Sequence, residues 1–262
     1  ADVVLIADLP ALREMIQLGA IARWRVPTDA RFDAQYKWEG AAYAPYLTNM
    51  SLVYNKNKLT AEEVKVLRSS GWAAAADPRF QGRFAASPLA CGVCYAGVQM
   101  FLATPGYGDA FLKKVAANKP VVFASTVVGL DRVIAGEVSF IFWSFENAAL
   151  PAWQAGAPIE WIHPDPTAAY PNSWLALAEK SSAPNAARLF YSWFLSEEGA
   201  AAIQHDLGAV STIGGVPDRR EVTKQPWYTR ISKKYSVDFQ RWDDKYDAEM
   251  KLWQDILAGR AK

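Results

Sequence analysis

The hydrophobic positions along the chain alternate between short continuous runs and helical spacings. Residues 3–7 form an apolar run that is typical of a buried strand. Leu9, Leu12 and Ile16 then follow at the spacing of one helix face, and this helix is expected to stop at Gly19. The other main strands that the pattern predicts are 47–54, 83–86, 120–124, 138–143, 159–163 and 173–179. Repeated strand–helix units favour an α/β fold with open, largely parallel sheets covered by helices.

Helical spacing is strongest near the end of the chain, where apolar residues recur every three or four positions. The residues of this stripe are Phe239, Trp242, Tyr246, Met250, Trp253 and Leu257. The spacing predicts an amphipathic helix over 239–257. Further helices are expected over 60–68, 88–102, 127–135, 147–155, 184–196 and 197–205.

Composition narrows the class of protein. The chain has 262 residues, of which 51% are apolar and 21% charged, as in folded proteins with one large domain or two lobes. Its 28 basic and 27 acidic side chains give a net charge of +1, so no basic stripe is available for a nucleic acid. The longest uncharged stretches are broken by Gly, Pro and polar residues before about 20 apolar residues accumulate, so no membrane-spanning segment is expected.

Signatures of catalysis and metal binding are sparse. The two histidines, His163 and His205, belong to no zinc-protease motif, and the sequence has no phosphate-binding loop and no nucleophile elbow. Solvated or capping roles are expected for both histidines. Cys91 and Cys94 form a single CxxC, for which two small buried residues or a structural disulfide is the simplest reading. We therefore predict no enzyme, no metal and no cofactor.

Several residues at predicted strand ends are candidate ligand contacts, because ligands of α/β sheets bind outside the carboxyl ends of the strands. Trp143 and Tyr170 could form a stacking pocket, with core packing as the alternative. Polar groups at predicted helix starts could hold a solute or serve only as helix caps. These polar candidates are Asp8, Ser87, Ser125 and Thr126.

Loose motifs along nearly the whole chain resemble the solute-binding proteins of bacterial ABC importers. They begin with Pro45-Tyr46 and the run that ends at Tyr54-Asn55. The remaining motifs are Gly71-Trp72, the segment 77–83, Gly136-Glu137-Val138 with Trp143, the segment 155–159 with Pro164, and the segments 186–190 and 195–199. Their order and spacing resemble extracellular solute-binding family 1, in the branch for spermidine/putrescine, thiamine and ferric iron.

This resemblance implies a type II periplasmic-binding-protein fold, in which two α/β lobes are joined by crossing hinge strands and close over a solute. Lobe one is expected over 1–48 and 172–208, and lobe two over 49–171 and 209–262. Because complete members carry further residues before the first strand, the N-terminal part of lobe one is expected to be absent. The resemblance also implies a monomer that is periplasmic or lipid-anchored outside the inner membrane, with a membrane permease as partner.

The resemblance places Tyr46, Trp143 and Tyr170 at ligand-contacting aromatic positions. It also shows departures from the family pattern. Asn172 stands where polyamine binders have a carboxylate, and Leu89 and Gly92 stand at two others, so a buried polyamine would lack its counter-charges. Ferric-iron binders have adjacent tyrosines where this chain reads Phe142-Trp143-Ser144-Phe145.

We therefore predict a small polar organic solute, neutral or anionic, bound by Tyr46, Ser87, Ser125, Thr126, Trp143, Tyr170, Asn172 and Asp8. Glu146 is expected in the first turn of a helix; if it instead points into the site, an amine beside Trp143 becomes attractive through cation–π contact. One alternative is a ferric-iron or other metal transport protein that uses Tyr46 or Tyr170. Another is an enzyme on the same fold, of the thiamine-pyrimidine biosynthesis type.

Overall fold

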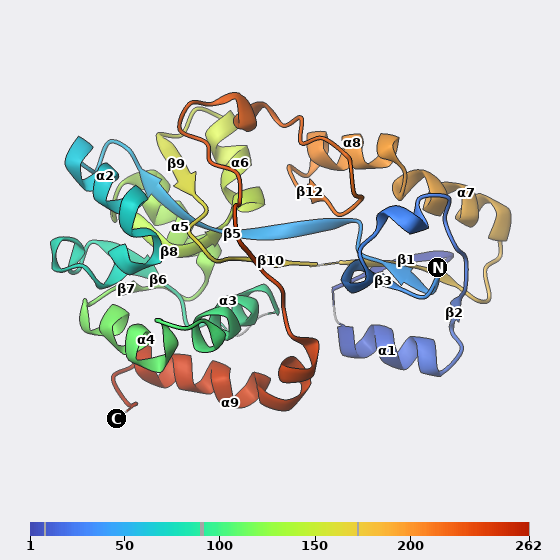
Figure 1. Ribbon diagram of the computed structural model, residues 1–262, viewed down its shortest axis with the longest axis horizontal. Coiled ribbons are helices and arrows are strands. Elements are labelled where there is room, and N and C mark those ends of the chain that lie inside the picture. Colours follow the sequence, from blue (N-terminus) through green and yellow to red (C-terminus); the bar gives the residue numbers. More distant parts are fainter. Residues whose placement is uncertain (8, 90–91, 172, 262) are drawn as a thin grey trace. The chain divides into compact units, whose positions relative to one another are not determined.

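The computed structural model describes residues 1–7, 9–89, 92–171 and 173–261 (Figure 1). The candidates Asp8 and Asn172, together with Cys91, lie outside the described residues. Contacts divide the chain into two compact units. Unit 1 contains Ala1–Thr48 and Pro171–Glu221, and unit 2 contains Asn49–Tyr170 and Val222–Lys262. The chain thus passes from one unit to the other within strand β5 (Tyr46–Asn55), after strand β10 (Thr167–Tyr170) and after Glu221.

Unit 1 is built on an antiparallel sheet with the order β1-β11-β4-β3. β1 pairs with β11 from Val3 opposite Leu177 to Ile6 opposite Trp174. The prediction of largely parallel sheets is wrong here, because β1 pairs with a strand far along the chain that returns in the opposite direction. The elements of unit 1 are β1 (Val3–Ile6), α1 (Leu9–Gln17), β2 (Ile21–Ala22), β3 (Lys37–Trp38), β4 (Ala42–Tyr43), β11 (Trp174–Ala178), α7 (Pro184–Phe194), α8 (Glu197–Asp206) and β12 (Val210–Ser211).

Residues 209–221 pack with unit 1, whereas residues 209–262 are expected in lobe two. β12 pairs with the first residues of β5, Val210 opposite Leu47 and Ser211 opposite Tyr46. Arg220, whose side chain is buried, donates to the carbonyl of Gly208 at 2.7 Å. These contacts hold the segment on unit 1 up to the boundary after Glu221.

Unit 2 has a mixed sheet in which β6 pairs in parallel with both β7 and β8, while β5 pairs antiparallel with β8 and β9. Its parallel part follows the predicted strand–helix rhythm. The strands are β5, β6 (Phe84–Ala86), β7 (Val121–Val122), β8 (Phe140–Phe145), β9 (Ile159–Ile162), β10 and β13 (Lys234–Tyr235). The helices are α2 (Ala61–Ser70), α3 (Gly92–Ala103), α4 (Gly108–Ala117), α5 (Thr126–Ala135), α6 (Glu146–Gln154) and α9 (Phe239–Leu257).

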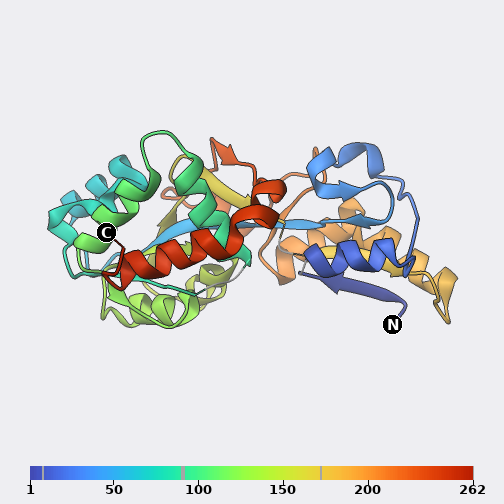
Figure 2. The ribbon, with the colours of Figure 1, turned by 90° about the horizontal axis from the view of Figure 1, so that it is seen from below.

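The predicted amphipathic helix at the end of the chain is α9, which packs against α3 and α4 (Figure 2). Its stripe enters the larger apolar core of unit 2 through the fully buried Trp253 and the nearly buried Met250. The Asp238 side chain caps the helix by accepting from the amide of Arg241 at 3.0 Å. Helix α4 was not predicted, although Phe111, Leu112 and Val115 are its buried residues and have helical spacing.

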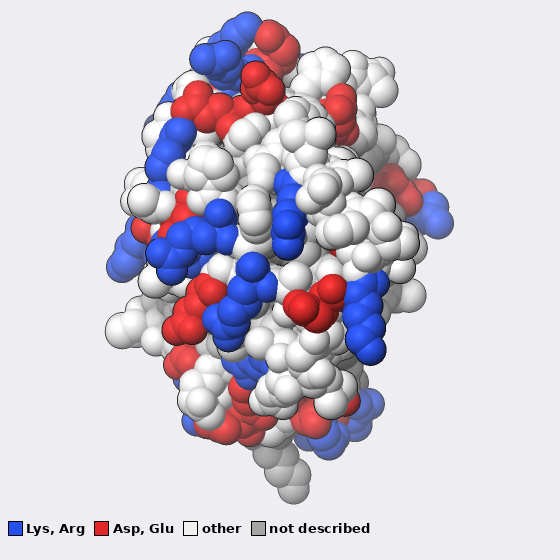
Figure 3. Space-filling view, turned by 90° about the vertical axis from the view of Figure 1, so that its right-hand side faces the viewer, with Lys and Arg blue, Asp and Glu red and all other residues white. Residues whose placement is uncertain are grey.

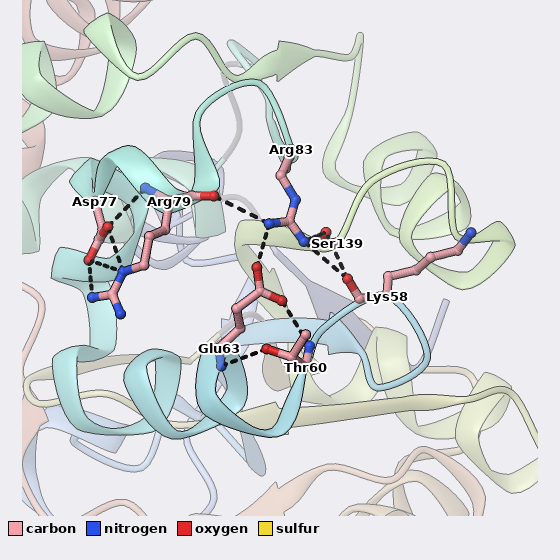
Figure 4. A network of polar contacts seen from close by, with 7 residues as sticks. All are labelled: Lys58, Thr60, Glu63, Asp77, Arg79, Arg83 and Ser139. Carbon is pink, nitrogen blue, oxygen red and sulfur yellow. Dashed lines mark hydrogen bonds and ion pairs between the residues drawn. The ribbon is translucent and has the colours of Figure 1, made fainter.

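A surface network of unit 2 ties helix α2 to the strands (Figure 4). Thr60 and Glu63 form a capping box at the start of α2, each accepting from the other's backbone amide. Glu63 also pairs with Arg83, whose guanidinium reaches the Lys58 carbonyl at 3.2 Å. The Arg83 hydrogen bond is the main reason that the pKa of Glu63 lies below its usual value. These contacts are structural and involve no predicted site residue.

Figure 3 shows charges of both signs side by side on one face. Within unit 1, Arg31 pairs with Glu197 at 2.5 Å. In the described part of the chain, no helix combines the length and the apolar character needed to cross a membrane.

Candidate functional site

An irregularity in the strand pair β5–β8 decides which β8 side chains face which side of the unit 2 sheet. Ser51 lies opposite Ser144, but Val53 lies opposite Ile141, so β8 has one extra residue between these pairs. Such a bulge turns two consecutive residues toward the same face. The two residues are Phe142 and Trp143, and both lie in the larger apolar core. Ser144 is thereby left on the other face, beside Ser51.

Polar side chains gather on that other face, where the strands reach the end of unit 2. Met50 lies opposite Phe145, so Asn49, one residue earlier, is on the face of Ser51, and its side-chain amide reaches Glu146, which follows Phe145, at 3.2 Å. We call Asn49, Ser51, Ser144, Glu146, His163 and Tyr228 the Glu146 cluster. Every one of these residues except Tyr228 is less than 9% exposed.

His163 follows strand β9 directly and joins the cluster from there. β9 pairs with β5 so that Leu52 lies opposite Ile162. His163 is the next residue after this pair. Its Nε2 atom lies 3.5 Å from Oε2 of Glu146, and the two side chains are 1% and 2% exposed. The expectation of a solvated or capping histidine is therefore wrong for His163, because its ring is buried and Nδ1 lies 2.9 Å from the Thr229 carbonyl oxygen.

The carboxylate of Glu146 contacts three other residues of the cluster, Asn49, Tyr228 and His163. It accepts from the Asn49 side-chain amide at 3.2 Å and from the Tyr228 hydroxyl at 2.9 Å. Glu146 is also the first residue of α6, as the sequence predicted, so the helix N-terminus favours its charged form. A buried carboxylate needs such partners, because an unpaired charge in the interior is very costly.

Several polar atoms of the cluster have no hydrogen-bond partner in the described structure. They are Asn49 Oδ1, Ser51 Oγ, Ser144 Oγ and His163 Nε2. Buried polar atoms in native proteins are nearly always paired, and each exception calls for an explanation. The cluster therefore offers hydrogen-bonding capacity that the protein itself leaves unused.

The two aromatic candidates contribute to the larger core of unit 2. Trp143 is 3% exposed and packs against Trp253, with ring centroids 5.0 Å apart. Tyr170 is 2% exposed and stacks on Trp242 at 5.3 Å. Both placements agree with the core-packing alternative, and solute stacking by these rings stays a prediction.

The polar candidates are distributed over both units. In unit 1, the Tyr46 hydroxyl donates to Ser173 Oγ at 3.1 Å. In unit 2, the Ser87 hydroxyl accepts from the Leu89 amide at 3.2 Å. Ser125 caps helix α5 through the Val128 amide at 3.2 Å, and the adjacent Thr126 is 6% exposed. Ser125 thus has the capping role that was its alternative reading.

The remaining chemistry-bearing residues fit structural roles. Cys94 is disulfide-bonded, which agrees with one of the two readings of the CxxC segment. His205 is solvated as expected: its side chain is 87% exposed and contacts Asp206 at 2.7 Å. Among the described residues, no group of three or more His, Cys, Asp or Glu is arranged to hold a metal ion.

Sequence reasoning missed most of the Glu146 cluster. One signal was available: Asn49 and Ser51 are polar at alternate positions of a strand that is mostly apolar, which places both on one face. The bulge that turns Ser144 to the same face leaves no comparable signal, because its position depends on pairing with a strand far away in the sequence.

Comparison with known proteins agrees with this fold. The model of the family "Bacterial extracellular solute-binding protein" matches residues 1–206. The chain therefore belongs to the bacterial extracellular solute-binding protein family. The resemblance to solute-binding proteins of ABC importers is thus confirmed. No curated protein matches the sequence.

Solved structures show the same type II periplasmic-binding fold at low sequence identity. Iron-bound HitA of Pseudomonas aeruginosa has a TM-score of 0.69 and 17% identity, over 98% of this chain and 82% of that one. The ferric binding protein of Bordetella has a TM-score of 0.73 and 18% identity, and the match covers 100% of this chain and 84% of that one. AfuA of Actinobacillus pleuropneumoniae, with fructose-6-phosphate bound, has a TM-score of 0.67 and 19% identity. The match covers 98% of this chain and 83% of AfuA. At such identities the likeness establishes the fold.

Proposed function

We propose that this chain is the capture subunit of an ABC importer, working in the periplasm, and that its cargo is a small polar organic solute, neutral or anionic. Units 1 and 2 would be the two lobes that the sequence resemblance implies. Family membership supports the transport role, since the family consists of extracellular solute-binding proteins. The solute class rests on the residues of this chain.

The unused hydrogen-bonding capacity of the Glu146 cluster carries this proposal. Asn49, Ser51 and Ser144 present buried polar atoms without partners on one face of the sheet. Ligand sites are typically apolar surroundings with a few well-placed polar groups. The same face continues into an apolar cluster that includes Val53 and Trp161. A polar organic molecule would satisfy the unpaired atoms, and binding would recover the cost of leaving them buried.

A ferric ion is the competing cargo, since HitA and the Bordetella protein are iron-binding by name. Iron in such a site calls for negatively charged oxygen ligands. The hydroxyl of Tyr46 already donates to Ser173, and Tyr170 stacks within the core. The segment 142–145 presents Ser144, not a phenol, to the Glu146 cluster. These placements favour the organic solute.

An enzyme on the same fold would need a reactive group at the buried histidine. His163 is paired with Glu146, as in many catalytic dyads, but its Nε2 has no hydrogen-bond partner among the described residues. A nucleophile activated by His163 would have to lie within about 3.2 Å of this atom. Solute binding without chemistry is therefore the better-supported function.

The proposal is tested by identifying what the purified protein carries. Native mass spectrometry of the gently purified protein should show a bound small organic compound, and isothermal titration should show that this compound rebinds to the stripped protein. Ferric citrate titrated in parallel should give no comparable heat. A coloured iron complex without an organic cargo would replace the proposal by its ferric alternative, and turnover of the recovered compound would indicate an enzyme.

A further inference from the structure

Strand β5 contains two buried asparagines whose hydrogen bonding differs. Asn55 is 2% exposed and Asn49 is 4% exposed. The Asn55 side chain is satisfied at both ends: its Nδ2 donates to the Val133 carbonyl at 2.9 Å, and its Oδ1 accepts from the Asn57 amide at 2.9 Å. The Asn49 Nδ2 donates to Glu146 Oε2 at 3.2 Å, but its Oδ1 has no partner among the described residues. Asn49 thus keeps one buried atom unused.

The contact with Glu146 fixes which atom of the Asn49 side chain is unused. A carboxylate oxygen accepts hydrogen bonds, and Glu146 also accepts from the Tyr228 hydroxyl at 2.9 Å. Turning the Asn49 amide by half a turn would bring its oxygen against a carboxylate oxygen, so that two acceptors would meet. The unused atom is therefore the amide oxygen, which can accept a hydrogen bond but cannot donate one.

The Asn49 side chain is also held in place. Its strand is paired on the next two residues, with Met50 opposite Phe145 and Ser51 opposite Ser144. The hydrogen bond to Glu146 fixes the other end of the side chain. An unpaired buried acceptor lowers stability, and native proteins pair nearly all such atoms. The positioned oxygen of Asn49 is therefore explained best by a donor that the protein itself does not supply.

Two serine hydroxyls on the same face behave differently from Asn49. Ser51 and Ser144 are 0% and 1% exposed, and neither hydroxyl has a partner. A serine hydroxyl can donate or accept, so it adapts to the group that it meets. The Asn49 oxygen cannot adapt in this way. Among these unpaired atoms, the requirement for one kind of solute group lies in Asn49.

A fixed acceptor selects the chemistry of its partner. A hydroxyl or an N–H group of the solute would satisfy Asn49 Oδ1. A carboxylate oxygen, an ether oxygen or a fully ionised phosphate oxygen has no hydrogen to donate, and it would face Oδ1 with its own lone pairs. Such a group would leave Oδ1 buried and unpaired, which costs binding free energy.

We propose that Asn49 is a specificity-determining residue of the Glu146 cluster: its Oδ1 accepts a hydrogen bond from a hydroxyl or N–H group of the solute. This inference rests on the proposed function and narrows its solute class. The solute carries a hydrogen-bond donor at this end, as polyols and amides do, and any carboxylate or phosphate that it has is bound by other residues.

The inference is tested with analogues of the compound that the purified protein carries. Each analogue lacks one donor: a hydroxyl is replaced by fluorine, which has no hydrogen to donate, or an N–H is methylated. Isothermal titration of the wild-type protein should find one analogue that binds at least about tenfold more weakly than the parent compound. The chemistry of that analogue distinguishes a hydroxyl donor from an N–H donor.

The variant Asn49→Ala assigns the sensitive donor to Asn49. Without Oδ1, the parent compound and the sensitive analogue should bind within about twofold of each other. Asn55→Ala is the matched control, because it removes a buried asparagine of the same strand whose oxygen is already paired. This control should keep the difference between the two compounds.

A crystal structure of the wild-type protein with the compound tests the same point without any variant. An oxygen or nitrogen of the solute that carries hydrogen should lie within about 3.2 Å of Asn49 Oδ1. This measurement decides the question if Asn49→Ala does not fold.

The outcomes separate the two proposals. Equal binding of the parent compound and all analogues by the wild-type protein overturns the inference and leaves the transport function intact. Ordered water alone, or a carboxylate of the solute, at Asn49 Oδ1 in the crystal structure does the same. Equal binding of the two compounds by Asn55→Ala as well as by Asn49→Ala also overturns it, since the effect is then not specific to Asn49. If no organic compound binds at all, the proposed function fails and the inference fails with it.

Discussion

The two faces of the unit 2 sheet differ in how completely their side chains are satisfied. On one face, Trp143, Phe142 and Trp253 pack ring against ring with centroids 4.9 to 6.2 Å apart. On the other, the Glu146 cluster keeps buried polar atoms without partners beside an apolar cluster. Close packing without polar atoms is what stabilises a fold. Unused buried hydrogen-bonding capacity costs stability, and it is where a binding protein is expected to gain affinity.

The largest expected effect on stability comes from removing an aromatic ring from the packed face of the unit 2 sheet. Trp143→Ala removes a large buried ring and should lower the free energy of unfolding by about 3 to 5 kcal/mol, measured by urea denaturation. Trp143→Phe keeps most of the packing and serves as the control. If the variant with Phe binds solute about tenfold more weakly at unchanged stability, Trp143 contacts the solute as the sequence resemblance implied.

The next effect comes from separating the buried contact between His163 and Glu146, whose Nε2 and Oε2 atoms lie 3.5 Å apart. Glu146→Gln and His163→Gln should each lower the free energy of unfolding by about 2 kcal/mol, because Glu146 accepts from Asn49 and Tyr228 and His163 contacts the Thr229 carbonyl, all inside the unit. The double variant should lose clearly less than the sum of both. Strict additivity in this cycle would mean that the two side chains do not interact.

A smaller and opposite effect is expected for the serines of the cluster. Ser51→Ala and Ser144→Ala remove unpaired buried hydroxyls, so stability should be unchanged or rise by up to about 1 kcal/mol, while solute affinity falls. Ser139→Ala is the matched control, since Ser139 is also buried but donates to the Lys58 carbonyl at 3.4 Å. Ser139→Ala should lose stability and keep its solute affinity. If Ser51→Ala and Ser144→Ala instead lose stability and keep their solute affinity, the two serines do not bind the solute.

The smallest effect concerns the surface network around helix α2. The pKa of Glu63 is lowered, chiefly by the hydrogen bond from Arg83. A carboxyl group with a depressed pKa stabilises the fold above its unfolded pKa, and this contribution is lost as the pH falls through the folded value. Glu63→Gln should therefore reduce the acid dependence of unfolding below about pH 5, by less than about 1 kcal/mol. An identical pH profile in both proteins would contradict this.

Local patterns were sufficient to predict much of the fold. The stripe over 239–257 coincides with α9, and the cap at Ser125 with the start of α5. The antiparallel sheet of unit 1 was not predictable in this way. Its central strand β11 pairs with β1 and β4, which lie more than 120 residues earlier, and strand direction follows from that long-range pairing.

The candidate site was harder to predict than the fold. Serine, asparagine and histidine are common on surfaces, and their chemistry here comes from burial and from partners brought by distant segments. Glu146 and Tyr228, for example, are hydrogen-bonded although they lie 82 residues apart in the sequence. For His163 the sequence favours a solvated or capping role, since a single histidine before a proline shows nothing of the carboxylate beside it.

The account is tested most directly by the affinity of the recovered solute for two proteins, the wild-type chain and the double variant Ser51→Ala/Ser144→Ala, measured by isothermal titration. The Glu146 cluster as solute site predicts that the variant binds at least about tenfold more weakly while unfolding at the same or a higher urea concentration. Equal affinities in the two proteins would contradict it.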